Sequence, residues 1–175
     1  MKETEAKILE VDRPALERKL RALGATISFD DELYAIYYDR PEGPLRAAGK
    51  VLRIRKEGPE VVLAYKAPVP GSDPALKVRE EIEVTVSDFD ALRTILEGTG
   101  HTPVLRMRKH RVQWDLGPVH VVFDDYLDEQ AHIPVFVEIE APDAESLYRT
   151  AEVLGYGKGD LKNWSAAELF VHYAR

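Results

Sequence analysis

The sequence predicts an α+β protein built on an eight-stranded antiparallel β-barrel, with a polar, charged lumen and helices packed outside. Three observations lead to this prediction. About eight segments alternate apolar and polar residues at the two-residue spacing of a strand, the polar positions are almost all charged, and four amphipathic helical patterns lie between these segments. No Ser/Gly-rich linker interrupts the 175 residues, so we expect a single domain over residues 1–175.

The expected strands are separated by turn-rich segments. They cover roughly Glu3–Val11, Leu33–Tyr38, Val51–Lys56, Val61–Ala67, Val78–Val86, Leu105–Trp114, Val119–Asp125 and Phe136–Ala141. Loops rich in Pro, Gly and Asp are expected at 40–49, 68–74 and 128–134.

Helical spacing of apolar residues fills the remaining gaps. Asp12 is expected to cap the first helix and Gly24 to end it. Ser87 is expected to cap the second, whose apolar stripe runs to Gly98. The third is predicted at about 143–154 and the last at about 165–173.

The charged positions decide which face of each strand points inward. In ETEAK, Glu3, Glu5 and Lys7 share one face of a strand, and five other segments repeat this pattern. The amphipathic helices need an apolar surface, which only the opposite strand faces supply, so the charged faces must line the interior of a closed barrel. The alternative is an open sheet with a solvated charged surface. That reading suits any one strand better, but it weakens when both signs of charge recur across six strands.

Composition excludes several classes of function. The absence of cysteine excludes disulfides, thiolate zinc sites and a cysteine nucleophile. A net charge of −7 disfavours a nucleic-acid partner, and no apolar run is long enough for a membrane span or a secretory signal. We therefore expect a cytoplasmic protein with neither a nucleic acid nor a membrane as partner. The GK[ST], HExxH, GxSxG and GxGxxG motifs are also absent.

The predicted lumen combines acids with bases. Its acids are Glu3, Glu5, Glu81, Glu83, Asp124, Glu138 and Glu140. Oxygen ligands without cysteine or clustered histidine favour a hard ion such as Mg²⁺ or Mn²⁺. Its bases are Lys7, Arg53, Arg55, Lys66, Arg79, Arg106 and Arg108, and strand parity also turns His110 and His120 inward. Because phosphate oxygens accept bidentate arginine forks, this set predicts a site for metal and polyphosphate.

The same residues carry a family resemblance that covers nearly the whole chain. ETEAK resembles the ExExK signature of the CYTH, or triphosphate tunnel metalloenzyme, superfamily, which includes class IV adenylyl cyclases, thiamine triphosphatases and inorganic triphosphatases. Five further blocks resemble family motifs in the same order: YYDRPEGPLRAAGKVLRIR, LAYKAP, KVREEIE, VLRMRKHR and VVFDDYLDEQAHIPVFVEIEA, followed by the tail KNWSAAELF.

The resemblance implies roles for individual residues. It implies that metal is bound by Glu3, Glu5, Glu138 and Glu140 with help from Asp124, while Glu81 and Glu83 sit on a second metal or orient the bases. It implies that the triphosphate is held by Lys7, Arg53, Arg55, Lys66, Arg106, Arg108 and Lys162, with Arg106 standing where a lysine is usual. We add Arg79 to the triphosphate set and expect Glu3, Glu5, Lys7 and Lys66 to be the catalytic residues. A homodimer is suggested at the level of the family alone.

Three functions follow as hypotheses. The leading one is a Mg²⁺- or Mn²⁺-dependent phosphohydrolase that acts on inorganic triphosphate, thiamine triphosphate or a nucleoside triphosphate, with water attacking the terminal phosphorus. The second is a class IV adenylyl cyclase that forms cyclic AMP and pyrophosphate from ATP. The third is a non-catalytic polyphosphate- or nucleotide-binding module, which the many acids disfavour because carboxylates without metal weaken anion binding.

Overall fold

The computed structural model describes residues 2–174. Its strands are β1 (Lys2–Ile8), β2 (Thr26–Asp39), β3 (Val51–Glu57), β4 (Glu60–Pro68), β5 (Lys77–Val86), β6 (Thr102–Leu116), β7 (Val119–Tyr126) and β8 (Phe136–Ala141). Its α-helices are α1 (Arg13–Ala22), α2 (Pro44–Ala47), α3 (Phe89–Gly98), α4 (Ala144–Leu154) and α5 (Ala166–His172), and two short 3₁₀ turns cover Asp128–Gln130 and Lys158–Asp160.

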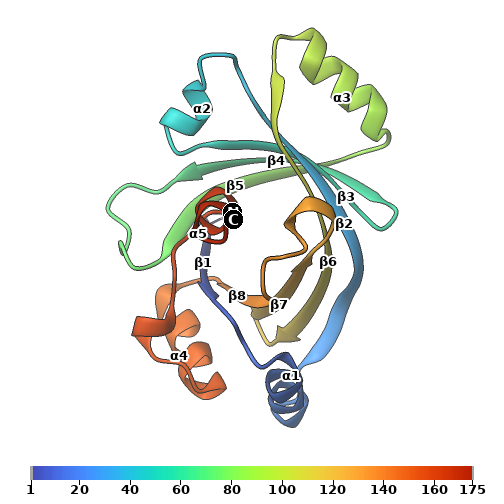
Figure 1. The fold of residues 1–175 in the computed structure, drawn as a ribbon. Coiled ribbons are helices and arrows are strands. Elements are labelled where there is room, and N and C mark those ends of the chain that lie inside the picture. The colour runs from blue at the N-terminus through green and yellow to red at the C-terminus, as the bar shows by residue number, and fades with distance from the viewer. Residues whose placement is uncertain (1, 175) are drawn as a thin grey trace.

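The eight strands form a closed barrel in the order β1-β5-β4-β3-β2-β6-β7-β8. Every neighbouring pair is antiparallel, and β1 closes the ring by pairing with both β5 and β8. Figure 1 looks along the barrel and shows the strands surrounding a central space. The predicted fold class, an α+β protein with an eight-stranded antiparallel barrel, is thus confirmed.

Element boundaries differ from the sequence prediction at several places. The strand β2 begins at Thr26 and pairs with β6 through two register shifts, so this ribbon is longer than alternation alone indicated. The second long helix is capped by Asp88, which accepts a hydrogen bond from the Ala91 N–H at 2.9 Å, whereas Ser87 was expected there. The segment 40–49, predicted to be a loop, contains the one-turn helix α2. Asp39 organises it by accepting the backbone N–H groups of Leu45 and Arg46.

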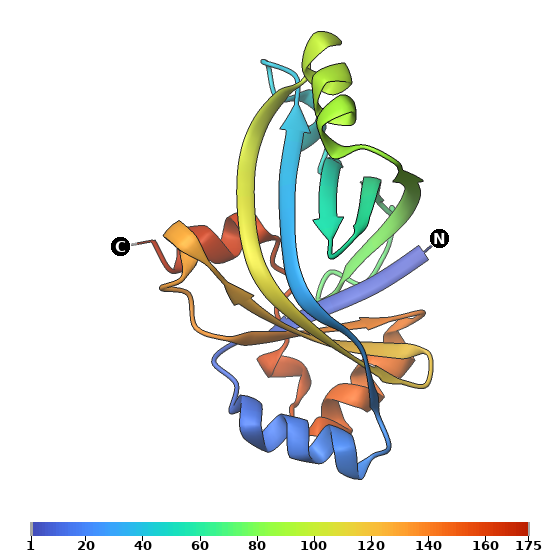
Figure 2. The ribbon, with the colours of Figure 1, turned by 90° about the vertical axis from the view of Figure 1, so that its right-hand side faces the viewer.

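Helices pack on the apolar outer faces of several barrel strands as predicted, but Ile82 and Val84 on the outer face of β5 are exposed. Figure 2 shows α1 and α4 together at one side of the barrel and α3 at the opposite side. The buried side chains Leu20 and Leu147 join α1 and α4 to the outer faces of β1, β7 and β8. Likewise, Leu92 and Leu96 of α3 pack on Ile36 of β2. With the outer faces occupied in this way, the charged faces point into the barrel.

The last helix has a different place. In Figure 1, α5 lies in front of the barrel opening, beside β1 and β5. Leu169 of α5 is fully buried in a cluster with Tyr126 of β7 and Phe136 of β8. The chain leading to α5 is fixed to the barrel because the backbones of Lys7 and Lys162 exchange two hydrogen bonds of 2.8 Å. The helix α5 therefore narrows one end of the lumen.

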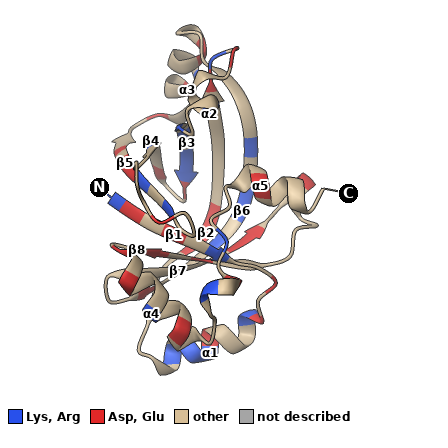
Figure 3. Cartoon of the chain, turned by 90° about the vertical axis from the view of Figure 1, so that its left-hand side faces the viewer, with Lys and Arg blue, Asp and Glu red and all other residues tan. Residues whose placement is uncertain are grey.

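Both signs of charge lie on the barrel strands. Figure 3, with Lys and Arg in blue and Asp and Glu in red, shows acidic and basic residues along β1 and a basic stretch on β3. Among the described residues, the helices are too short or too polar to cross a membrane.

Candidate active site

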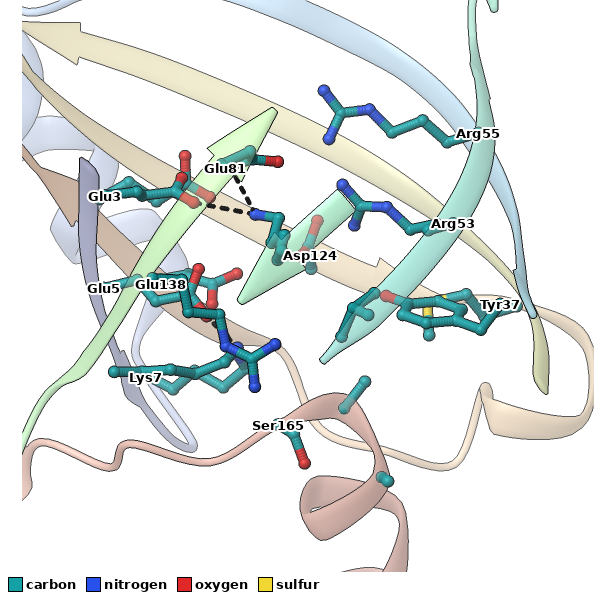
Figure 4. Close-up of a pocket in the computed structure, with 18 of the residues that line it drawn as sticks. Glu3, Glu5, Lys7, Tyr37, Arg53, Arg55, Glu81, Asp124, Glu138 and Ser165 are labelled. Atoms are coloured by element: carbon teal, nitrogen blue, oxygen red, sulfur yellow. Dashed lines mark hydrogen bonds and ion pairs between the residues drawn. The ribbon is translucent and has the colours of Figure 1, made fainter. Parts of the chain in front are cut away.

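The barrel encloses a cavity of about 1490 Å³. Most of the predicted site residues line it, since they occupy the inward positions of β1, β3, β4, β5, β7 and β8. These are Glu3, Glu5, Lys7, Arg53, Arg55, Lys66, Arg79, Glu81, Glu83, Asp124, Glu138 and Glu140, together with His120. Figure 4 shows acids of β1 and arginines of β3 pointing toward one another across this space.

Three carboxylates meet where the first and last strands pair. Glu5 lies directly opposite Glu140 in the β1–β8 register, and Glu3 is two residues away on the same face. One oxygen atom from each of the three lies within 4.8 Å of the others. Like charges in directly opposed positions destabilise a sheet, so this arrangement requires protons or a cation between the carboxylates.

Two of these carboxyl groups hold their protons unusually tightly. Burial, followed by a hydrogen bond with Glu81, raises the pKa of Glu3 from 4.5 to about 7. Burial and the neighbouring Glu138 raise the pKa of Glu140 to about 7 as well, in spite of Arg111 nearby. Burial would also raise the pKa of Glu5, but the ammonium groups of Lys77 and Lys7 outweigh it and hold that pKa well below its usual value. The cluster thus combines an ionised centre with two acids that give up their protons near neutral pH.

Lysines form ion pairs with acids of this cluster and with the acids beside it. The Lys66 ammonium lies 2.9 Å from a carboxylate oxygen of Glu3 and 2.9 Å from one of Glu81. Lys77 pairs with Glu5, and Lys7 pairs with Glu138. Although burial lowers the pKa of Lys7, the Glu138 carboxylate more than compensates and raises it. Lys7 and Lys66, whose pKa values are raised, therefore stay charged across the physiological range, and a phosphate that replaces a carboxylate meets a cation that is already in place.

Arg53 has buried N–H donors without a hydrogen-bond partner among the described residues. Its Nε and Nη2 atoms are buried and donate no hydrogen bond to any described residue. The Glu83 carboxylate lies 4.0 Å from Nη2, which is an ion pair without a hydrogen bond. The guanidinium also lies 5.8 Å from the ring centre of Tyr37. Because buried donors are rarely left unsatisfied, these atoms point to an anionic ligand in the lumen.

Asp124 has a different environment from the three clustered acids. Both of its oxygens accept hydrogen bonds from Arg111, each at 2.8 Å, and one of them also accepts from Lys109. Burial would raise the pKa of Asp124, but these two bases hold it far below its usual range. Asp124 lies in the lumen as predicted, yet its oxygens serve to orient Arg111 and Lys109, whereas we expected them to bind metal.

The inward orientation predicted for Arg106, Arg108 and His110 is wrong. Arg108 is largely exposed and donates to Glu32 at 2.7 Å, and His110 pairs with Asp30 at 3.1 Å. Their strand β6 carries bases on both faces, so charge alone could not fix its parity. The pairing with β2 does so, because Met107 lies opposite Ala35 and both are buried against the barrel interior. Arg106, opposite Ile36, consequently lies on the outer face.

Lys162 contacts the barrel through its backbone. Its pairing with Lys7 places the C-terminal segment next to the lumen. Its side chain is half-buried, and it is not among the side chains that line the cavity.

Several polar residues of the lumen were missed by the sequence analysis. They include Lys77, Lys109, Arg111 and Tyr37. Lys77 precedes Arg79 by two residues and so shares its face, a signal that was available. Lys109 and Arg111 follow from the corrected parity of β6. Tyr37 shares its face with Ala35 and Leu33, so the search for charged positions passed over it.

Known proteins resemble this chain in sequence and fold. A family model described as the CYTH domain matches residues 1–160. The chain belongs to the CYTH domain family. Adenylate cyclase CyaB of Aeromonas hydrophila is 30% identical over 169 residues, which cover 93% of this chain and 85% of CyaB.

Solved structures of CYTH proteins share the barrel. One is a candidate adenylate cyclase of Vibrio parahaemolyticus, at 20% identity and a TM-score of 0.80 over 97% of both chains. Another is HpAC1 of Hippeastrum, at 16% identity and a TM-score of 0.67 over 97% of this chain and 95% of that one. HpAC1 is a candidate adenylyl cyclase described as having a dominant triphosphatase activity. At these identities the likeness establishes the fold.

The CYTH family consists of enzymes that generally depend on a divalent metal ion. The acid cluster fits such an ion. Glu3, Glu5 and Glu140 offer only oxygen atoms, lie close enough together to share one cation, and are flanked by bases suited to phosphate.

Proposed function

We propose that the chain is a divalent-metal-dependent phosphohydrolase that acts on a triphosphate inside its barrel. The observation that carries this proposal is that the Glu3–Glu5–Glu140 cluster and the unsatisfied donors of Arg53 line the same lumen. The acids of such a site suit a metal ion and the bases suit a polyanion. A neutral ligand would leave both sets of buried charges without a partner of opposite sign.

The chain's own residues divide the work. Glu3, Glu5 and Glu140 would hold Mg²⁺ or Mn²⁺, which when bound supplies positive charge that neutralises and polarises phosphoryl oxygens. Arg53 and Arg55 of β3 would bind phosphate oxygens together with Lys66 and Lys77 of the adjoining strands β4 and β5. Transfer of a phosphoryl group depends mainly on positioning and on stabilising charge, so a lumen with fixed cations suits it.

The supporting residues keep this arrangement in place. Lys7 is held by Glu138 and Arg111 by Asp124, so each base stands at a fixed angle to the lumen before substrate arrives. We also infer that Arg79, Glu81 and Glu83 complete the wall on β5, where they line the same cavity.

A second candidate is an adenylyl cyclase. The observation that favours it is the similarity to CyaB over 93% of the chain. In that reaction the ribose 3′-hydroxyl replaces water as the attacking group and pyrophosphate leaves. The same lumen residues would serve both reactions, because the difference lies in which phosphorus faces the nucleophile.

One experiment distinguishes these functions. The protein is incubated with ATP, inorganic tripolyphosphate or thiamine triphosphate, each with Mg²⁺ or Mn²⁺, and orthophosphate, pyrophosphate and cyclic AMP are resolved. We expect metal-dependent release of orthophosphate. Cyclic AMP with pyrophosphate would establish the cyclase instead, while tight binding without turnover of any substrate would make the chain a binding module.

The C-terminal segment belongs to the same proposed unit. Because Lys162 pairs with Lys7 of β1 and α5 packs at one end of the barrel, we infer that the whole chain acts as one domain around a single site. A homodimer is part of this proposal only as a family-level expectation, which size-exclusion chromatography with light scattering would test.

A further inference from the structure

The lumen is not charged throughout. Toward α5, the inward positions of β2 and β6 carry Tyr37, Leu105 and Met107, where the sequence analysis had placed Arg106 and Arg108. Tyr37 lies directly opposite Leu105 in the β2–β6 register, so the two side chains form one continuous surface. The lumen thus has an acidic and basic region around Glu3 and Glu5 and an apolar region beside it.

The helix α5 adds a third wall to this apolar region. Ala166 and Phe170 of α5 line the same cavity, and the Phe170 ring packs edge-on against Tyr126 at 5.0 Å. Figure 4 places Ser165, at the start of α5, at the same end of the site as Tyr37 and Lys7. The apolar region is therefore enclosed by strands and by α5.

Three of these side chains are accessible to a ligand. Tyr37, Leu105 and Phe170 are each half-buried and face the cavity, in contrast to Met107, which is buried in the wall. Apolar surface facing a water-filled cavity is unfavourable, and an apolar ligand group that covers it is bound more tightly. An inorganic triphosphate gains nothing from such a surface, since all its atoms are charged or strongly hydrated.

Tyr37 joins the two regions. On the side of the charged region, the Arg53 guanidinium lies over the Tyr37 ring, 5.8 Å from the ring centre. Burial would raise the pKa of Tyr37, but the nearby guanidinium of Arg53 and ammonium of Lys109 outweigh it and lower that pKa. A ligand whose phosphates reach Arg53 therefore brings its next group to Tyr37.

We propose that the substrate is an organic triphosphate whose flat, apolar-faced group, such as a nucleobase, binds between Tyr37, Leu105 and Phe170 at the α5 end of the lumen. This inference rests on the proposed function, because it takes the triphosphate to lie among Arg53, Lys66 and the acid cluster. It assigns discrimination between organic and inorganic triphosphates to residues that do not touch the phosphates.

The test compares an organic ligand with an inorganic one. Calorimetry with Mg²⁺ measures the Kd of the β,γ-imido analogue of ATP and of diimidotriphosphate, an inorganic analogue, so that binding is read without turnover. The variants are Leu105→Ala and Phe170→Ala, with Val171→Ala as the control. Val171 follows Phe170 on α5 and is 77% exposed, so its change should affect neither ligand.

We expect each lumen variant to raise the Kd of the ATP analogue roughly tenfold, as loss of one apolar contact predicts, and to leave the Kd of diimidotriphosphate within about twofold. An equal loss of affinity for both ligands, or no loss for either, would overturn the inference. So would an unmodified protein that binds only the inorganic analogue. If Phe170→Ala displaces α5, Leu105→Ala still tests the surface, because Leu105 lies on a barrel strand.

Failure of the proposed function has a different signature. An unmodified protein that turns over no triphosphate would refute the phosphohydrolase, yet the ratio of the two Kd values would still decide this inference. Conversely, turnover of tripolyphosphate and ATP with equal loss in the variants would keep the hydrolase and reject the apolar subsite.

Discussion

The ammonium of Lys66 lies 2.9 Å from the carboxylate of Glu3, so a base assigned to phosphate directly contacts an acid assigned to metal. The same lysine also reaches Glu81. Burial lowers the pKa of Lys66 and Arg53 lowers it further, but the carboxylates of Glu5, Glu3 and Glu81 outweigh both and raise it. Acids and bases of the lumen thus neutralise one another. On binding, a metal ion would replace the lysine as the partner of the acids, and a phosphate would replace the acids as the partner of the lysine.

Replacing a clustered acid should abolish metal-dependent activity. We expect Glu5→Gln to lower kcat/KM at least ~100-fold and to weaken Mn²⁺ binding, because it removes the ionised centre of the Glu3–Glu5–Glu140 cluster. Titration calorimetry with Mn²⁺ and phosphate-release assays measure the two effects. Glu60→Gln, an exposed acid at the start of β4, is the matched control. Full metal-dependent turnover by Glu5→Gln would refute the assignment.

Metal binding should strengthen as the pH rises from about 5.5 to 8. Glu3 and Glu140, with pKa values of about 7, must lose their protons before they can bind a cation. The dissociation constant for Mn²⁺, measured by calorimetry across this range, should fall throughout it and begin to level off near pH 8, since each acid is only half ionised at about pH 7. A constant affinity over the whole range would contradict the raised pKa values.

The same two acids should make the metal-free protein less stable at higher pH. In the unfolded chain they titrate near 4.5, so between 4.5 and about 7 the folded state binds more protons than the unfolded state. The stabilisation that the two protonated acids give the folded state is fully present below pH 4.5 and is lost as the pH rises through 7. Thermal melts of metal-free protein should show Tm falling over this window, and Mg²⁺ should raise Tm more at pH 8 than at pH 5.5. Melts with the opposite slope would count against the protonated pair.

The corrected parity of β6 gives a direct comparison of two arginines. Arg111→Lys keeps the charge but loses the two-pronged contact with Asp124, so we expect kcat/KM to fall about tenfold or more. Arg108→Lys changes an exposed residue on the outer face, and its activity should stay within about twofold of the unmodified protein. Steady-state kinetics on both variants decides the matter. A larger loss of kcat/KM in Arg108→Lys than in Arg111→Lys would support the sequence prediction that Arg108 points into the lumen.

Stability of the barrel should depend strongly on the α4 contact. Leu147 is fully buried between α4 and the outer strand faces, so Leu147→Ala should lower the free energy of unfolding by about 2–5 kcal/mol through lost burial and a cavity. Val153, on the same helix, is 43% exposed, and Val153→Ala should cost less than about 1 kcal/mol. Chemical denaturation of both proteins measures the difference.

The sequence predicted the barrel well because charge and apolarity alternate cleanly on most strands. In β1, β3, β5 and β8 charged residues recur at every second position, and most of the intervening residues are apolar, with Lys56 and Glu80 among the exceptions. The parity of these strands follows from this pattern. The strand β6 is different because Arg106, Arg108, Lys109 and Arg111 place bases on both faces. Only pairing across the sheet shows which set points inward, and that information is tertiary.

The candidate site was predicted to a similar extent. Local alternation located Glu3, Glu5 and Glu140, but it could not show that the oxygens of Asp124 are occupied by Arg111 and Lys109, because these contacts join separate strands. Nor could it find the apolar end of the lumen, which depends on the placement of α5 and on the register between Tyr37 and Leu105.

The position of the acid cluster at the β1–β8 junction affects how the protein folds. Glu3 and Glu5 belong to the first strand and Glu140 to the last, so the cluster exists only after the ring has closed. Pairings between chain ends form slowly, since a long loop must be ordered first. A cation bound at this junction would therefore contact both strands only after the folding transition state. It would leave the rate of folding nearly unchanged and would slow unfolding, which begins when the ring opens.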